Sequence, residues 1–125
     1  MTHTILIVDD EAGIVVPLEF LMKKSGYTVL IARTGEEALQ WVEKQTPDLI
    51  LLDLMLPLCS GFEVCQKIRE HPQWKGIKMI MLTAKSRETD MAKGMALGAD
   101  AYITKPFSTH KLVDMVAEML NDIQK

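Results

Sequence analysis

The stretch ILIVDDEAG, residues 5–13, decides the fold. Its apolar run at residues 5–8 predicts a strand covered on both faces, because a strand with one face in water alternates apolar and polar side chains. Acids follow this run without a break, and their mutual repulsion lowers stability unless a cation or a proton compensates for it. The stretch therefore predicts a buried strand that ends at a site with a demand for positive charge.

Short runs rich in β-branched and other apolar residues indicate further strands. The first, third and fourth runs show no alternation of apolar and polar residues. We expect these three in the centre of a sheet that has helices on both faces. In chain order, the expected strands are Ile5–Val8, Thr28–Ala32, Leu49–Leu52, Met79–Leu82 and Ala101–Thr104.

A helical pattern follows each expected strand. Ile14, Leu18 and Leu21 repeat at the spacing of one helix face. Thr34 and Glu37 have the spacing of a capping box, which marks the start of a second helix. Further helices are expected around residues 64–68, over about 88–97 and from Ser108 onward. Strict alternation of strands and helices predicts an α/β fold, a doubly wound sheet of five parallel strands with five helices.

Pro17 conflicts with the first expected helix. It lies several residues past any plausible helix start, where it removes a backbone hydrogen bond and crowds the preceding turn. We therefore expect either a kink at this residue or a late start of the helix.

Length and composition exclude several classes of protein. The 125 residues suit one domain, 1–125, and the 48% hydrophobic and 25% charged residues are typical of a globular protein. Neither a membrane span nor a secretory signal is apparent, so we expect a cytoplasmic location. A net charge of −3 argues against direct nucleic-acid binding. Cys59 and Cys65 form no metal or disulfide pattern, and we expect both to be reduced.

Polar side chains follow four of the five expected strands. Asp9 and Asp10 follow the first, Asp53 the third, Thr83 the fourth and Lys105 the fifth. Each one alone has an ordinary structural explanation, as a helix cap or a solvated charge. Ligands of this fold class bind at the edge where the carboxyl ends of the strands meet. We therefore interpret the set as one site.

This set of side chains has the chemistry of phosphoryl transfer. Clustered carboxylates with little imidazole nearby suit Mg²⁺, which prefers oxygen ligands. A carboxylate beside that cation can act as a nucleophile toward phosphorus and form an aspartyl phosphate. The ammonium and the hydroxyl would each contact a phosphoryl oxygen, and the cation and ammonium would neutralise the transferring group.

Four blocks of the sequence resemble the signature blocks of the receiver, or response-regulator, domain of bacterial two-component signalling. They have the family's order and spacing, and the resemblance covers the whole chain. It implies a flavodoxin-like fold with strand order 2-1-3-4-5. It also implies a signalling switch, not an enzyme, whose chemistry is limited to self-catalysed phosphoryl transfer and autodephosphorylation. The blocks are VDDE (8–11), DLILLDLMLP (48–57), MLTAK (81–85) and GADAYITKPF (98–107).

The resemblance implies that Asp53 is the phosphorylated residue and that the acids beside it bind Mg²⁺. Asp9, Asp10 and Asp53 would position the cation, with Asp10 as the more direct ligand of the first pair. The backbone carbonyl of Met55 would complete the protein's share of the ligands. We interpret Glu11 as an acid at a helix start, where the helix dipole favours it.

The resemblance also implies how a signal enters and leaves. A sensor histidine kinase or phosphotransfer protein would supply the phosphoryl group, which Lys105 would contact. Thr83 would be the switch hydroxyl and Tyr102 the aromatic switch residue, and the Lys105–Pro106 bond would be cis. The face formed by the fourth and fifth helices would change for an output domain or protein. Ala101 replaces an acid that many receivers carry on this face, which puts their salt-bridged dimer in doubt.

Three other interpretations share parts of this pattern. A Mg²⁺-dependent phosphatase of the haloacid dehalogenase type uses the same nucleophile, but it carries a second acid two positions later, where this chain has Met55. A flavodoxin-like carrier of FMN needs a Gly-rich or hydroxyl-rich turn after the first strand, and the acids here would repel its phosphate. The chain can also be the receiver portion of a longer regulator or hybrid kinase.

Overall fold

The computed structural model describes residues 2–56, 59–83, 88–105 and 107–124. Its five strands are parallel and lie in the order β2-β1-β3-β4-β5, which confirms the predicted fold class and strand order. In chain order the elements are β1 Thr4–Val8, α1 Ala12–Lys24, β2 Thr28–Ala32, α2 Gly35–Lys44, β3 Leu49–Asp53, α3 Gly61–Glu70, the 3₁₀ turn η1 Pro72–Trp74, β4 Lys78–Thr83, α4 Glu88–Leu97, β5 Ala101–Thr104 and α5 Thr109–Gln124.

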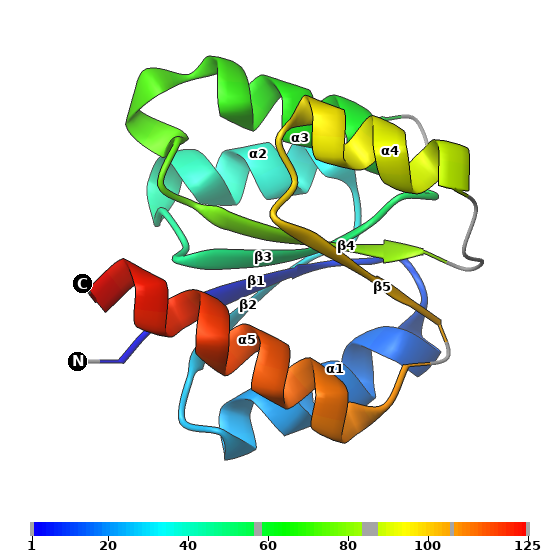
Figure 1. Cartoon of the computed structure of the whole chain (residues 1–125). Helices are drawn as coiled ribbons and strands as arrows, with labels where there is room; N and C mark the ends of the chain where they lie inside the picture. The colour runs from blue at the N-terminus through cyan, green and yellow to red at the C-terminus, as the bar shows by residue number, and fades with distance from the viewer. Residues whose placement is uncertain (1, 57–58, 84–87, 106, 125) are drawn as a thin grey trace.

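Helices cover both faces of the sheet. Figure 1 shows α1 and α5 on one face and α2, α3 and α4 on the other. Alternate residues of each strand point to opposite faces, and each face has its own apolar core. In β1, Ile5 and Ile7 pack in the core beneath α1 and α5, whereas Leu6 and Val8 pack in the core beneath α2 and α3. The sheet is therefore a rigid platform whose strand ends are fixed from both sides.

The strands without alternation lie in the centre of the sheet, as predicted. β3 is buried along its whole length, and β1 and β4 are buried after their first residue. The edge strands β2 and β5 alternate between buried and more exposed positions. Burial on two faces explains why the central strands need apolar side chains at every position.

Two helix starts show how local sequence fixes the loops at the sheet edge. Before α2, the Thr34 hydroxyl accepts the backbone N–H of Glu37 at 3.1 Å, and the Glu37 carboxylate accepts the N–H of Arg33 at 3.2 Å. The first bond confirms Thr34 as the N-cap, whereas the second reaches the residue before the N-cap and not the Thr34 N–H of a standard capping box. Before α5, the Ser108 hydroxyl accepts the N–H of Lys111 at 3.4 Å.

Pro17 lies inside α1, so the alternative of a late helix start is wrong. The helix begins at Ala12, and the Glu11 carbonyl accepts the N–H groups of both Ile14 and Val15. Pro17 removes the bond that would reach back to the Gly13 carbonyl. Gly13 is exposed, so water can satisfy that carbonyl and the helix tolerates the proline.

A polar network ties α3 to the segments that precede β4 and β5. The Arg69 guanidinium donates to the carboxylate of Asp100 at 2.9 Å, to the carbonyl of Gly98 at 2.8 Å and to the carbonyl of Lys75 at 3.1 Å. The Asp100 carboxylate also accepts the N–H of Met79 at 2.8 Å. An added Cβ at Gly98 would lie 2.6 Å from the Arg69 side chain. Glycine is therefore required where the arginine crosses.

Candidate functional site

The strand ends place the predicted site residues at one edge of the sheet. Asp9 follows β1 and is fully buried, while Asp53 is the last residue of β3 and is 2% exposed. Asp10, one residue further along, is exposed to solvent. Successive side chains point to opposite sides of the chain, so Asp9 is buried and Asp10 is exposed. The two acids of the pair therefore have different environments.

Lys105 lies at the centre of this acidic edge. Its ammonium nitrogen is 3.0 Å from Asp9 Oδ2, 3.4 Å from Asp53 Oδ1 and 3.8 Å from Glu11 Oε1. The backbone N–H of Lys105 donates to the Thr83 carbonyl at 2.6 Å, which fixes the lysine against the end of β4. The Lys105 ammonium thus pairs with three carboxylates that come from two different strand ends.

Burial and charge shift two pKa values in this cluster. Burial raises the pKa of the Asp53 carboxyl, and the charge of Asp9 raises it further, although the N–H of Met55 and the Lys105 ammonium oppose both effects. Burial lowers the pKa of Lys105, but the hydrogen bond to Asp9 and the charges of Asp53, Asp9 and Glu11 outweigh it, so the net shift is upward. The upward shift of the Lys105 pKa, caused by three carboxylates, indicates a site short of positive charge.

The acids form a cluster that can accept a hard divalent cation. One oxygen each from Asp9, Asp10, Glu11 and Asp53 lies within 4.8 Å of the others. Opposite ligands of Mg²⁺ lie about 4 Å apart, because each Mg–O distance is about 2.1 Å. The donor set is all oxygen and strongly anionic, as Mg²⁺ prefers. The residues present therefore fit the predicted cation, with small side-chain adjustments.

Backbone contacts hold Asp53 in a fixed orientation. Its Oδ1 accepts the N–H of Met55 at 3.2 Å. The start of α3 packs directly on the end of β3, since an added Cβ at Gly61 would lie 2.4 Å from the Asp53 carbonyl oxygen. The Met55 side chain is 75% exposed. The position that a haloacid dehalogenase phosphatase fills with an acid thus carries a solvent-facing thioether, and the role predicted for the Met55 carbonyl remains a prediction.

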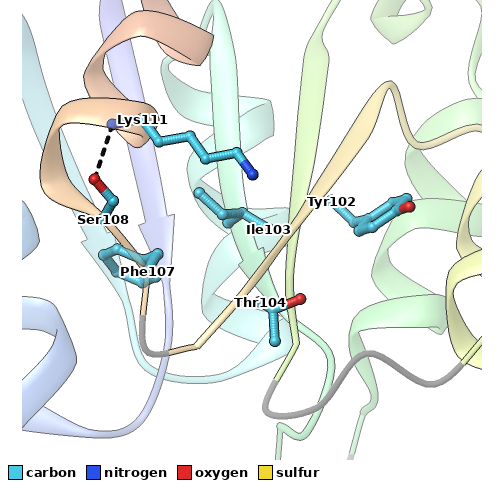
Figure 2. Close-up of a pocket in the computed structure, with 6 residues that line it drawn as sticks. All are labelled: Tyr102, Ile103, Thr104, Phe107, Ser108 and Lys111. Atoms are coloured by element: carbon cyan, nitrogen blue, oxygen red, sulfur yellow. Dashed lines mark hydrogen bonds between the residues drawn. The ribbon is translucent and has the colours of Figure 1, made fainter.

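Thr83 and Tyr102 lie on neighbouring strands near the acidic edge. Thr83 ends β4 and is 3% exposed, and it pairs in register with Thr104 of β5. Tyr102 is 38% exposed. Figure 2 shows its ring turned away from Ile103 and Lys111, on the other side of β5. A shallow hollow beside the strand is lined by Tyr102, Ile103, Thr104, Phe107, Ser108 and Lys111.

The structure leaves one sequence prediction open and adds a contact to another. The cis bond predicted between Lys105 and Pro106 lies outside the described residues, because Pro106 is not among them. Glu11, interpreted as a helix-start acid, is the N-cap of α1 but makes no side-chain cap hydrogen bond. Its carboxylate faces Lys105 instead. The only sequence signal for this was its position directly after Asp9 and Asp10.

Comparisons with known proteins agree with this fold. The family model of the response regulator receiver domain matches residues 5–117. The chain is 47% identical over 120 residues to the alkaline phosphatase synthesis transcriptional regulatory protein PhoP of Bacillus subtilis, covering 96% of this chain and 49% of that relative. The chain thus spans about half the length of this curated relative.

Two solved structures illustrate the likeness of the fold. A response regulator receiver domain protein (CheY-like) from Methanospirillum hungatei has a TM-score of 0.91 and 33% identity, covering 98% of this chain and 96% of that one. The chemotaxis response regulator CheY4 of Vibrio cholerae has a TM-score of 0.90 and 29% identity, covering 95% of this chain and 99% of that one.

Across the described part of the chain, none of the helices has the length and apolar character of a membrane span.

Proposed function

Because the chain belongs to the response regulator receiver domain family of two-component signalling, we propose that it is a switch activated by phosphorylation of Asp53. The observation that carries the proposal is the geometry around that residue. Asp53 ends the most buried strand, its Oδ1 is 3.4 Å from the Lys105 ammonium, and the acids that fit Mg²⁺ lie beside it. We further propose that residues 1–125 form one receiver domain.

The proposed reaction is transfer of a phosphoryl group from a phosphohistidine of a sensor kinase or phosphotransfer protein. A carboxylate oxygen of Asp53 attacks the phosphorus, and the new P–O bond forms as the P–N bond breaks. The imidazole leaves after it takes up a proton from water. Lys105 neutralises charge on the phosphoryl oxygens, and the N–H of Met55 holds the attacking carboxylate in place.

Asp9, Asp10, Asp53 and the carbonyl of Met55 would hold Mg²⁺. When bound, the cation would supply further charge neutralisation for the transferring phosphoryl group. Asp9 is already engaged, because it accepts the N–H of Glu11 at 3.0 Å and pairs with Lys105. Asp10 is exposed and therefore accessible to a hydrated cation. This difference supports Asp10 as the more direct ligand.

The output of the switch would be a change on the α4, β5 and α5 face. The Asp53 phosphoryl group would attract the Thr83 hydroxyl, and Tyr102 would turn from its exposed position into the space that Thr83 vacates. The 38% exposure of Tyr102 is the starting state that this proposal requires. The Bacillus subtilis relative is a transcriptional regulatory protein, so we propose that the output partner or domain acts in the control of transcription.

The phosphorylation step is tested by labelling with a small acyl phosphate and Mg²⁺. Wild type is expected to take up one phosphoryl group, and Asp53→Asn is expected to take up none while it keeps its circular dichroism spectrum. Asp48→Asn is the matched control, because Asp48 precedes the same strand at its opposite end. Equal labelling of wild type and Asp53→Asn would overturn the proposal.

The switch step needs a separate experiment. Thr83→Ala is expected to retain the label on Asp53 but to lose the phosphorylation-dependent change in amide exchange around Tyr102. A full change in Thr83→Ala would show that the signal takes another route, even if Asp53 is the phosphorylated residue. A phosphatase of the haloacid dehalogenase type would release phosphate from monoesters over many turnovers, whereas we expect a single turnover on Asp53.

A further inference from the structure

We infer that Glu11 is a fourth carboxylate of the cation site, acting as a positioning residue that holds a hydrated divalent cation and Lys105 at the solvent side. This inference rests on the proposed function and extends it to a residue that sequence reasoning interpreted as an acid at a helix start. Glu11 would act through its charge and through cation-bound water, while the three aspartates remain the direct ligands.

The conformation of Glu11 is the first observation. As the N-cap residue of α1 it is well placed to cap the helix, yet its carboxylate makes no cap hydrogen bond. It lies 3.8 Å from the Lys105 ammonium. One of its oxygens is within 4.8 Å of oxygens of Asp9, Asp10 and Asp53. The side chain therefore points into the cluster and away from its own helix.

The different exposures within the cluster suggest different tasks. The Asp9 and Asp53 side chains are 0% and 3% exposed, whereas the Glu11 side chain is 64% exposed. Mg²⁺ sheds its water reluctantly and keeps several water molecules when it binds to proteins. An exposed carboxylate on a long, flexible side chain can accept hydrogen bonds from those waters without displacing them. Glu11 has the reach and the exposure for this role.

Lys105 supplies a second reason for an additional acid. In this structure its ammonium pairs with both Asp9 and Asp53. A divalent cation at the aspartates would repel that ammonium. Among the described residues, Glu11 is the remaining carboxylate within 4 Å of Lys105. It can therefore keep the lysine at the site after the cation has taken over the aspartates.

The test is a calorimetric titration of Mg²⁺ into wild type, Glu11→Gln and Glu11→Asp. Glu11→Gln is expected to lower the affinity about three- to tenfold, because it removes one charge near the cation. Glu11→Asp keeps the charge and is expected to restore most of the affinity. The loss should be larger at low than at high ionic strength, since an exposed charge is screened by salt.

Matched controls separate this role from a structural one. Glu43→Gln makes the same change at an exposed position in the last turn of α2 and is expected to leave Mg²⁺ affinity unchanged. The cation-free melting temperature of Glu11→Gln should stay close to that of wild type. An unchanged Mg²⁺ affinity in Glu11→Gln would overturn the inference. If wild type itself bound no Mg²⁺ and took up no label on Asp53, the proposed function would fail as well.

Discussion

At the edge where the strands begin, each of two partly buried acids has its own hydrogen-bond donors, whereas at the edge where the strands end, three carboxylates share one ammonium. Asp48 accepts the N–H of Thr4 at 2.8 Å, and Asp100 is paired with Arg69 and with the N–H of Met79. At the other edge, Lys105 is the one cation that pairs with the acidic cluster among the described residues. The same residue type therefore has its partners within the chain at one edge and, in the proposed function, would bind a cation at the other.

This difference teaches how to separate structural from functional charges. A carboxylate whose partners are all supplied by the chain lowers the free energy of the folded state. A carboxylate in a cluster that holds more negative than positive charges raises the free energy of the folded state, until a bound cation supplies the missing positive charge. An excess of charge of one sign in a partly buried cluster is thus the better indicator of a binding site, because an acid that is paired within the chain needs no ligand.

The largest change in the free energy of unfolding is expected at the edge where the strands begin. Arg69→Ala should lower the free energy of unfolding by about 2–3 kcal/mol, because it removes the cation that pairs with the Asp100 carboxylate and the donor to two carbonyl groups. Urea denaturation followed by circular dichroism measures this change. A loss below about 0.5 kcal/mol, the size of a surface effect, would break the comparison.

Cation binding should stabilise the protein through the edge where the strands end, and not through the edge where they begin. Mg²⁺ at ten times its dissociation constant should raise the free energy of unfolding by about 1.4 kcal/mol. Asp10→Asn should remove most of this gain, because it removes the exposed carboxylate proposed as the direct ligand. Thermal melts with and without a chelator test this, and an equal shift in both proteins would argue against the site. Arg69→Ala should retain the Mg²⁺-dependent gain.

Neutralising Asp53 should change the free energy of unfolding in the opposite direction to Arg69→Ala. In the presence of a chelator at neutral pH, Asp53→Asn should stabilise the fold by about 1 kcal/mol, because burial and the charge of Asp9 disfavour the ionised carboxylate. Equilibrium unfolding in urea gives the value. A destabilised Asp53→Asn protein would mean that Asp53 is a net structural asset.

The pH dependence of that difference follows from linkage. The pKa of Asp53 is raised above its ordinary value of 3.8, so the folded state binds this proton more tightly than the unfolded chain. Wild type therefore loses stability as the pH rises from 3.8 through the raised pKa, and Asp53→Asn does not. The advantage of the variant should be complete at neutral pH and should vanish as the pH falls toward 3.8.

The smallest effect is expected at an ion pair that belongs to neither edge. Lys23 and Glu19 lie 3.0 Å apart on α1, with side-chain exposures of 59% and 32%. Lys23→Gln should change the free energy of unfolding by less than about 0.5 kcal/mol, because water screens exposed pairs. The same urea titration provides the measurement. A larger loss would show that pairing alone, without burial, explains the effect of Arg69.

The fold and most of the site were predictable because strand ends follow from local patterns. Apolar runs located β1, β3 and β4, and parallel topology then brought Asp9, Asp53 and Lys105 together. The Arg69–Asp100 pair was not predictable, because its members are 31 positions apart and no periodicity links them. The late helix start at Pro17 was wrong because a local backbone preference was outweighed by the packing of α1 on the sheet.

The acidic edge also determines how the whole molecule responds to an electric field. Its four carboxylates and one ammonium carry a formal −3, which equals the net charge of the chain, so the remaining residues sum to zero. The net charge of the chain is thus equal to the charge of the cluster at the strand ends. One bound divalent cation would change the net charge from −3 to −1. Native electrophoresis would therefore separate cation-bound from cation-free protein without any label.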